Sequence, residues 1–221
     1  MTHPTTILMT EFVTHDVQRF ILERPPDFDF TPGQGVKLAI DQPEWRDKGR
    51  PFTPTSLPSD GVVEFIIKGY PEHDGVTHAM QSLSAGDRLL MSEPFGSIAY
   101  RGPGVFIAGG VGITPFIPIF RMLHREGRLA GNHLLYTSRT PADIVCEKEL
   151  AHYLGERARF LCSREGSEHC LPRRIDRAYL EETIDDYGQH FYLCGPPPFV
   201  SALNETLVEL GATPEALVFE G

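Results

Sequence analysis

The 221-residue chain lacks the long apolar runs and the clustered cations that mark membrane and nucleic-acid proteins. No apolar run approaches the roughly 20 residues needed to span a bilayer. The segment Met1-Thr2-His3-Pro4 has neither the positive region nor the apolar core of a signal peptide. The net charge of −10 is shared evenly by the two halves of the chain, with no basic stripe. Because phosphate contacts need clustered cations, we expect neither a nucleic acid nor a membrane as partner.

Cysteine is scarce as well. Cys146, Cys162, Cys170 and Cys194 are spaced in no zinc or iron–sulfur ligand pattern. We therefore expect reduced cysteines and a cytoplasmic protein. The nine histidines show no ligand spacing either, so we predict no metal site.

Two domains are predicted, because the spacing of turns and apolar segments along the sequence changes near residue 103. Before it, short β-rich stretches alternate with Gly/Pro turns, which is typical of an antiparallel β-barrel. After it, strands alternate with helices, which predicts a Rossmann-like α/β domain with a parallel sheet covered on both faces. We place the boundary at Arg101-Gly102-Pro103-Gly104, giving domains over residues 1–101 and 102–221.

The predicted elements follow from this reading. One short helix interrupts the first set of strands, with Thr77 as its N-cap and Gly86 at its end. The predicted strands cover residues 5–10, 17–22, 36–40, 62–68, 88–91, 105–108, 134–137, 160–162, 191–194 and 216–219, and the predicted helices cover 78–84, 116–126, 146–153, 177–184 and 199–210.

A glycine-rich segment, Gly109-Gly110-Val111-Gly112-Ile113-Thr114-Pro115, joins a predicted strand to a predicted helix. Its glycines let the backbone approach a pyrophosphate. Thr114 is a good N-cap and Pro115 a good first helical residue, so bare N–H groups at the helix start would attract an anion. Pro115 stands where the full dinucleotide fingerprint has its third glycine, and the alternative interpretation is a ligand-free tight turn.

A second segment, Arg50-Pro51-Phe52-Thr53, offers a cation, an aromatic face and a hydroxyl, which are the groups that a flavin needs. Arg50 can bind a pyrophosphate through two parallel hydrogen bonds from its guanidinium group, and Phe52 can pack on the flavin surface. Thr53 can hydrogen-bond the region of flavin N5, where a hydride arrives. Gly75-Val76-Thr77, at a predicted helix start, can take the other side of the pyrophosphate. The alternative is a strand leaving a Pro-rich loop, with Arg50 solvated and Phe52 in the core.

Together these segments resemble the ferredoxin–NADP reductase superfamily. Arg50-Pro51-Phe52-Thr53 resembles its R-x-Y/F-S/T flavin motif, and Gly75-Val76-Thr77 its G-x-S/T flavin-phosphate motif. The segment from Gly109 to Pro115 resembles its G-G-x-G-I/V-T-P pyridine-nucleotide motif, and Cys194-Gly195-Pro196-Pro197 its C-G-P-P motif. The four motifs occur in family order and cover nearly the whole chain.

The resemblance implies an N-terminal FAD-binding barrel, a C-terminal NAD(P)-binding domain, and hydride transfer from the nicotinamide to flavin N5. It makes Thr53, near N5, and Cys194, beside the nicotinamide, the catalytic residues. The implied flavin ligands are Arg50, Pro51, Phe52, Thr53, Lys68, Gly75, Val76, Thr77, Thr114 and Phe219. The implied NAD(P) ligands are Gly110, Gly112, Ile113, Thr114, Pro115, Ser138, Arg139, Ser163, Arg164, Cys194, Gly195, Pro196 and Pro197.

The chain departs from the family pattern in three places. Phe52 stands where many members have Tyr, which removes one hydroxyl contact. No adenosine loop is obvious after Met91-Ser92-Glu93-Pro94-Phe95-Gly96, so FMN is the alternative to FAD. No terminal Tyr or Trp is present to stack on the flavin, and Phe219 is either its substitute or an ordinary strand residue.

Arginines after two predicted strands favour NADPH over NADH. Ser138-Arg139 follows the second strand of the α/β half, and Ser163-Arg164 follows the third, with Arg173-Arg174 close behind. Ser163-Arg164-Glu165 looks like the 2′-phosphate segment of NADPH-specific relatives. No Asp or Glu closes the second strand, where a ribose diol would be held.

The main functional hypothesis is a flavin-dependent NAD(P)H oxidoreductase that passes electrons to an outside acceptor. A ferredoxin, a flavodoxin or a small molecule would serve as this acceptor. One alternative is a reductase of free flavin or ferric iron, in which the flavin is a released substrate. Another is a non-catalytic docking or sensing subunit that kept the fold, which predicts no NAD(P)H oxidation with a dye acceptor.

Overall fold

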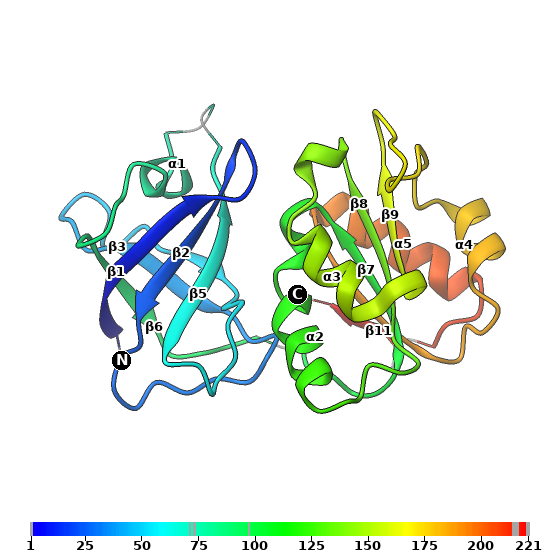
Figure 1. Cartoon of the computed structure of the whole chain (residues 1–221), viewed down its shortest axis with the longest axis horizontal. Helices are drawn as coiled ribbons and strands as arrows, with labels where there is room; N and C mark the ends of the chain where they lie inside the picture. The colour runs from blue at the N-terminus through cyan, green and yellow to red at the C-terminus, as the bar shows by residue number, and fades with distance from the viewer. Residues whose placement is uncertain (1, 71, 73, 97, 214–216, 220–221) are drawn as a thin grey trace. The chain divides into compact units, whose positions relative to one another are not determined.

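The computed structural model describes residues 2–70, 72, 74–96, 98–213 and 217–219, and the chain forms two compact units, Met1–Gly96 and Ser97–Gly221 (Figure 1). The division falls a few residues before the predicted boundary. Residues just before that boundary pack within the second unit, which explains the difference. The Tyr100 ring stacks on Tyr192 with centroids 6.1 Å apart, and the Arg101 N–H donates to the Tyr192 hydroxyl at 2.9 Å.

Alternating apolar residues build an antiparallel six-stranded sheet in the first unit, in the order β4-β3-β6-β1-β2-β5. The backbone N–H of Thr55, just after β4, donates to the carbonyl of Glu64 on β5 at 2.7 Å, so the sheet is a nearly closed barrel. Phe20, Leu38 and Phe65 fill its interior with exposures of 0–1%. The predicted antiparallel barrel is confirmed. Its strands are β1 (Thr2–Phe12), β2 (Val17–Glu23), β3 (Val36–Ile40), β4 (Arg50–Phe52), β5 (Val62–Lys68) and β6 (Arg88–Ser92).

Helix α1 (Val76–Met80) is shorter than predicted and begins earlier. The Gly75 carbonyl accepts hydrogen bonds from the backbone N–H groups of His78 and Ala79 at 3.1 and 3.0 Å, so the first turn starts at Gly75. Thr77 lies inside the helix and makes no cap, and its predicted role as N-cap of residues 78–84 is wrong. Burial of Val76 and Met80 in the barrel core favours a helix that starts at Gly75 over one that Thr77 would cap.

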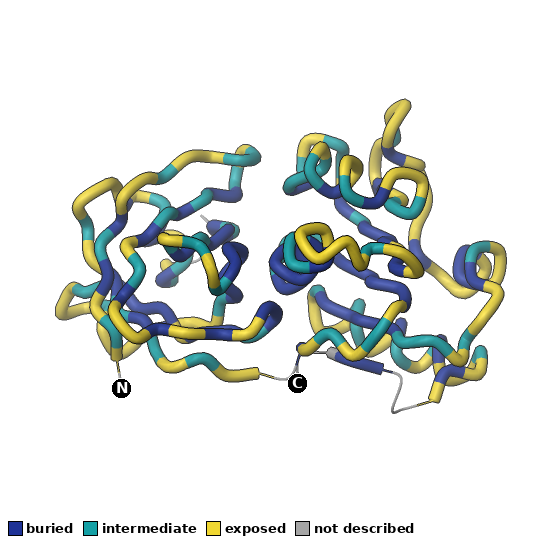
Figure 2. Tube along the Cα trace, turned by 60° about the horizontal axis from the view of Figure 1, so that its bottom comes forward, coloured by how far each residue is buried: buried dark blue, intermediate teal, exposed yellow. Residues whose placement is uncertain are grey.

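The second unit is a parallel five-stranded sheet in the order β11-β10-β7-β8-β9, with helices on both faces, as predicted. Figure 2 shows its central strands as buried tube, and every residue of β7 is buried. The strands are β7 (Gly104–Gly109), β8 (His133–Ser138), β9 (Ala158–Cys162), β10 (His190–Cys194) and β11 (Leu217–Phe219). The helices are α2 (Phe116–Arg125), α3 (Glu147–Leu154), α4 (Arg177–Thr183) and α5 (Pro197–Glu209), with short 3-10 turns η1 (Gly110–Ile113), η2 (Pro141–Asp143) and η3 (Gly155–Arg157).

Successive residues of β7 point to opposite faces of this sheet. Phe106 packs against Phe120 of α2, with ring centroids 4.6 Å apart. Ile107 belongs instead to the cluster that contains Leu180 of α4 and Leu203 of α5. Both faces are therefore covered, which explains why the strands read as continuous apolar runs. Within the described ranges, no helix has the length and apolar content needed to cross a membrane.

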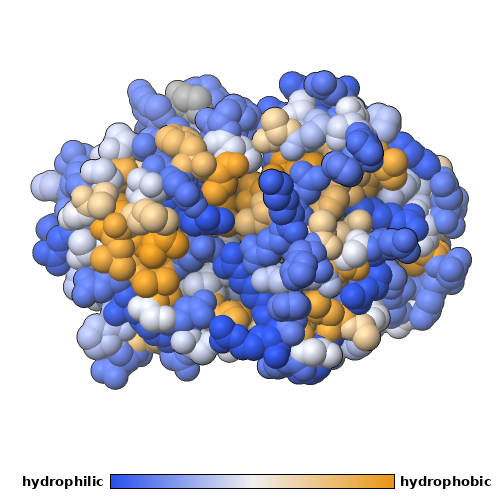
Figure 3. Space-filling view, viewed as in Figure 1, coloured by the Kyte–Doolittle hydropathy of each residue, from blue (hydrophilic) through white to orange (hydrophobic). Residues whose placement is uncertain are grey.

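The first strand of the barrel also exposes apolar side chains. Leu8, Met9 and Phe12 are 50%, 45% and 59% exposed, and Figure 3 shows apolar side chains gathered on the first unit. The pairing of β1 with β2 shifts between Ile7 and Met9, as in a β-bulge. The bulge interrupts the inward–outward alternation, so that two consecutive apolar residues are both exposed.

Candidate functional site

Four of the predicted nucleotide-binding segments lie at one edge of the parallel sheet. Strand register places Cys194 of β10 beside Ala108 of β7, and Gly109 of β7 beside Thr137 of β8. Ser138 of β8 in turn pairs with Cys162 of β9. The segments that follow these four strands therefore leave the sheet at the same carboxyl edge, where ligands bind in open α/β folds.

The turn after β7 is built on two glycines with different roles. Gly110 has φ +55, a conformation that favours glycine, and a Cβ there would meet nothing within 4 Å. At Gly112, by contrast, a Cβ would lie 2.4 Å from the carbonyl oxygen of Cys194. Gly112 therefore lets the turn pack against the end of β10, while Gly110 leaves an open face of the backbone.

The start of α2 differs from the prediction. Residues 110–113 form the 3-10 turn η1, and α2 begins only at Phe116, with Pro115 in the capping position. The Thr114 hydroxyl donates to the carbonyl of Val111 at 3.0 Å, so it does not cap α2. The predicted cap at Thr114 and first helical residue at Pro115 are therefore wrong. Ile113 is completely buried and offers a ligand only its backbone.

The two predicted 2′-phosphate segments run side by side beyond the ends of β8 and β9. The Ser163 N–H donates to the Ser138 carbonyl at 2.9 Å, and the Arg164 N–H donates to the Arg139 carbonyl at 3.0 Å. Both arginines are exposed, and neither pairs with a carboxylate in the described part of the chain. Arg173, in contrast, is held by Glu182 at 2.8 Å. Two available guanidinium groups on paired segments fit a phosphate.

The C-G-P-P segment follows directly from β10. Cys194 is 8% exposed, while Pro196 and Pro197 are exposed at the start of α5. A Cβ at Gly195 would lie 2.9 Å from the Phe199 ring, and one at Gly109 would lie 3.0 Å from the same ring. Phe199 therefore holds the ends of β7 and β10 close together. The sequence interpretation missed this residue, although an aromatic residue directly after three consecutive prolines was an available signal.

The predicted flavin segment lies on the short edge strand β4 and just beyond it. Arg50 is exposed and makes no ion pair within the described ranges, and Pro51 is exposed as well. Phe52 is half-buried against the barrel core, and Thr53 is 7% exposed. The Arg50 cation therefore reaches solvent, while the Phe52 ring is half-buried and Thr53 is buried. This arrangement fits a flavin nucleotide whose phosphates are more exposed than its ring.

The residues that fix this segment were not predicted. The Thr55 hydroxyl donates to the Glu64 carboxylate at 2.7 Å, and the Glu64 N–H donates to the Ser56 hydroxyl at 3.0 Å. Thr55 and Ser56 are 0% and 2% exposed. These hydrogen bonds hold the chain after Thr53 against β5. Their signal in the sequence was the run of small hydroxyl residues directly after the R-x-F-T motif.

The second predicted flavin segment surrounds the start of α1. A Cβ at Gly75 would meet nothing within 4 Å, so the backbone there has an open face. Val76 is 4% exposed and points into the core, while Thr77 is half-buried. The accessible groups of this segment are therefore the Gly75 backbone and the Thr77 side chain.

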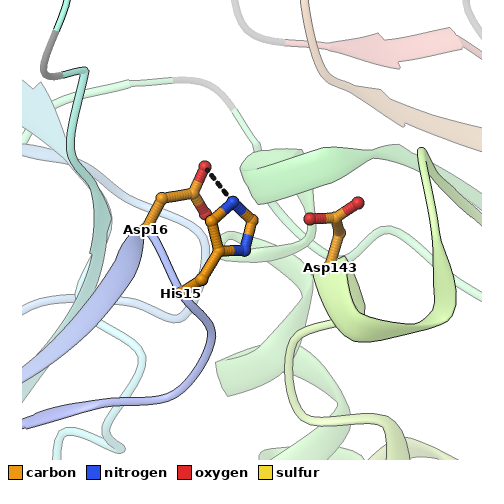
Figure 4. A group of neighbouring side chains, drawn as sticks. All are labelled: His15, Asp16 and Asp143. Atoms are coloured by element: carbon orange, nitrogen blue, oxygen red, sulfur yellow. Dashed lines mark ion pairs between the residues drawn. The ribbon is translucent and has the colours of Figure 1, made fainter.

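Lys68, another predicted flavin ligand, makes an ion pair inside the first unit. Its Nζ lies 2.6 Å from Oδ2 of Asp16. His15 Nε2 lies 3.5 Å from the same oxygen (Figure 4). Burial opposes the charge of Asp16, but the hydrogen bond and charge of Lys68 outweigh it and hold the Asp16 pKa below its ordinary value. Asp143, also labelled in Figure 4, belongs to the second unit, where it accepts the Thr140 N–H at 2.9 Å.

The cysteines differ from the reduced state expected from the sequence. Cys162 and Cys170 form a disulfide, with Cα atoms 5.8 Å apart, and Cys146 and Cys194 are not part of it. The chain leaves β9 after Cys162 and returns, so that Leu171 pairs with Leu161. This return brings Cys170 beside Cys162, and spacing alone gave no sign of it. The side chain of Phe219, the remaining predicted flavin contact, lies outside the described part of the structure.

Comparison with known families matches both halves of the chain. Residues 4–100 match the oxidoreductase FAD-binding domain, and residues 106–205 match the oxidoreductase NAD-binding domain. The chain therefore carries an FAD-binding and an NAD(P)-binding domain.

Individual proteins resemble the chain over nearly its whole length. The propane 2-monooxygenase reductase component of Rhodococcus jostii is 30% identical over 97% of this chain. The chain spans 62% of that relative's length. NADH–cytochrome b5 reductase 1 of Arabidopsis thaliana is 28% identical over 92% of this chain and 78% of its own. A ferredoxin NADP⁺ reductase from Neisseria gonorrhoeae, solved with FAD and NADP, has the same fold, with a TM-score of 0.86, 20% identity, and coverage of 99% of this chain and 98% of its own.

Proposed function

The chain belongs to the ferredoxin–NADP reductase superfamily of FAD- and NAD(P)-binding oxidoreductases, and on this premise we propose that it oxidises NAD(P)H and passes the electrons to an outside acceptor. The observation that carries the proposal is the match of two complementary nucleotide-binding domains in one chain. A flavin held by the first domain would supply the chemistry, which is acceptance of a hydride from a reduced nicotinamide and release of electrons singly or in pairs. The chain's own residues supply binding and alignment.

In the first domain, Arg50 neutralises the flavin pyrophosphate, and its exposure, with no acidic partner among the residues that the structure describes, supports this role. The Gly75 backbone and the Thr77 side chain bind the other side of the same group. Phe52 covers the ring system from its half-buried position, and Thr53 offers its hydroxyl to N5. Lys68 contributes its charge from a position fixed by Asp16.

In the second domain, the turn at Gly110 and Gly112 cradles the pyridine-nucleotide pyrophosphate. The open face at Gly110 and the close contact at Gly112 support this assignment. Cys194 and Gly195 border the nicotinamide at the end of β10. Because Cys194 is largely buried, we assign it a positioning role without thiolate chemistry.

We propose NADPH as the preferred co-substrate. Arg139 and Arg164 lie on hydrogen-bonded segments and have no carboxylate partner within the described ranges, which leaves both charges available to a 2′-phosphate. Replacement of Arg164 by Ala removes a charged hydrogen bond worth about 1.5–3 kcal/mol, so the KM for NADPH should rise by about 10- to 100-fold. The KM for NADH should not change.

The test is steady-state oxidation of NADPH and NADH by the flavin-loaded protein with ferricyanide as acceptor. Arg128→Ala is the control, because Arg128 is also exposed but precedes the start of β8, at the end of the strand opposite Arg139. An equal loss with NADH and NADPH in Arg164→Ala would disprove the NADPH assignment. Absence of oxidation with either nucleotide would disprove the enzymatic function and favour a non-catalytic subunit.

The acceptor is proposed from the relatives. Their names identify one as the reductase component of an oxygenase system and another as a cytochrome b5 reductase. We therefore propose a small electron-carrier protein, such as a ferredoxin or flavodoxin, or a redox partner enzyme. Reduction of a charged protein carrier should depend on ionic strength, whereas ferricyanide turnover by the same sample corrects for salt effects on the reductase itself. A carrier rate that follows the ferricyanide rate at every salt concentration would contradict a charged docking surface.

A further inference from the structure

The Cys162–Cys170 disulfide closes the loop that carries Ser163 and Arg164. Cys162 is the last residue of β9, so the bridge sits at the base of the segment that leaves the carboxyl edge of the sheet. Both cysteines are 1% exposed, while residues 163–165 and 167–169 are exposed. A buried covalent base thus supports a polar, largely exposed loop, and its Gly166 packs against the returning segment, where a Cβ would lie 2.8 Å from the Pro172 side chain.

Few hydrogen bonds attach this loop to the rest of the domain. Ser163 and Arg164 bind the segment after β8 through the two backbone bonds described above. Further along, Ser167 and Cys170 bond to each other through their backbones at 2.9 and 3.3 Å, which closes the loop on itself. The bonds between Leu171 and β9 anchor only the returning strand. Without the bridge, the middle of the loop would gain conformational freedom that a ligand must then remove.

Charge repulsion would also loosen the loop if the bridge were absent. Arg139 and Arg164 are like charges on paired segments, and neither is neutralised by a carboxylate within the described ranges. In the absence of an anion their repulsion favours separation of the exposed segments. A covalent link at the base of the loop limits this separation.

We propose that the Cys162–Cys170 disulfide is a positioning element that holds Arg164 beside Arg139 and thereby sets the selectivity of the protein for the 2′-phosphate of NADPH. The inference rests on the proposed use of Arg164 as a 2′-phosphate ligand. It adds that the affinity for this phosphate, and not the affinity for the rest of the nucleotide, depends on the bridge.

The direct test is calorimetric binding of 2′,5′-ADP and 5′-AMP to the full chain. In Cys162→Ser/Cys170→Ser the Kd for 2′,5′-ADP should rise by about 3- to 10-fold, because binding must now order the loop. The Kd for 5′-AMP should stay unchanged. Cys146→Ser is the matched control, because it removes a cysteine that is not in the bridge and should change neither value. In steady-state turnover, the double variant should have a higher KM for NADPH than the wild type, with an unchanged kcat and an unchanged KM for NADH.

A second measurement avoids dependence on the variant's folding. The Cys146 and Cys194 thiols of the wild-type protein are first alkylated, the bridge is then reduced with a phosphine and its two released thiols are alkylated, and mass spectrometry verifies each step before the same titrations. Protein that is alkylated but not reduced is the control. The same loss of 2′,5′-ADP affinity is expected. In an Arg164→Ala background, removal of the bridge should have no further effect on 2′,5′-ADP, because the bridge acts through this arginine.

The outcomes separate the inference from the proposed function. If the wild-type protein binds 2′,5′-ADP no more tightly than 5′-AMP, the NADPH preference is wrong and the inference is overturned with it. If the wild-type protein binds 2′,5′-ADP more tightly than 5′-AMP and the bridge-free protein shows the same ratio of affinities, the inference alone is overturned. If both ligands lose affinity equally, the bridge has only a general structural role, which also overturns it.

Discussion

Replacement of Gly112 by alanine tests whether the nucleotide turn packs directly on the end of β10. A methyl group at this position would lie 2.4 Å from the Cys194 carbonyl oxygen, 2.5 Å from its carbonyl carbon and 2.6 Å from the Gly195 Cα. All three atoms belong to the backbone, so no side-chain rotation relieves the overlap. The turn and the C-G-P-P segment would have to move apart.

The energetic cost follows from this geometry. Overpacking of a rigid interior typically costs about 1–3 kcal/mol, and contact with three backbone atoms places Gly112→Ala at about 3 kcal/mol or more. For a domain of this size such a loss lowers the Tm by about 10 °C. Because the displaced segments are the proposed pyridine-nucleotide site, NADP⁺ affinity should fall as well. Thermal unfolding by circular dichroism and NADP⁺ calorimetry measure the two effects.

Gly127→Ala is the control. Gly127 has φ +67, and a Cβ there would meet nothing within 4 Å. This variant therefore carries only the backbone cost of a left-handed residue, about 1–2 kcal/mol, and should bind NADP⁺ normally. A Gly112→Ala protein with a Tm at or above that of Gly127→Ala, and with normal NADP⁺ binding, would refute the close contact between the turn and β10.

Two further variants test how each unit is held together. Tyr192→Phe removes the hydroxyl that accepts the Arg101 and Gly102 N–H groups and donates to the Gly102 carbonyl at 2.8 Å. We expect a loss of about 1–3 kcal/mol in urea unfolding, and a loss below a few tenths of a kcal/mol would contradict it. In the first unit, the lowered pKa of Asp16 stabilises the fold above about pH 4, and this contribution is lost as the pH falls through the folded-state pKa. The free energy of unfolding should therefore fall less steeply with acid in Asp16→Asn than in the wild type, and identical slopes across the acid range would exclude a role for the Lys68–Asp16 pair.

Much of the fold was readable from the sequence because apolar periodicity and Gly/Pro turns agree with it. The strands over residues 36–40 and 62–68 have the predicted bounds, and the parallel sheet follows from alternating β and α segments. Helix starts were less predictable. Thr77 and Thr114 are both good caps by residue type, but burial of Val76 and the 3-10 turn at Gly110–Ile113 decide where α1 and α2 begin.

The candidate site shows the same division between local and long-range information. The motifs located the segments at the ends of β7 and β10 and on β4, because each motif is continuous in sequence. The supporting residues could not be found in this way. Phe199 contacts Gly109 and Gly195 only through the fold, Glu64 reaches Thr55 across the barrel, and Cys170 meets Cys162 only because Leu171 returns to β9.

The most direct test of the account is an anaerobic titration of the FAD-loaded protein with NADPH and NADH, followed by the absorbance of the flavin. The chain should retain FAD through gel filtration, and about one equivalent of NADPH should bleach the bound flavin. A chain that retains no flavin, or one whose bound flavin keeps its absorbance with both nucleotides, would contradict it.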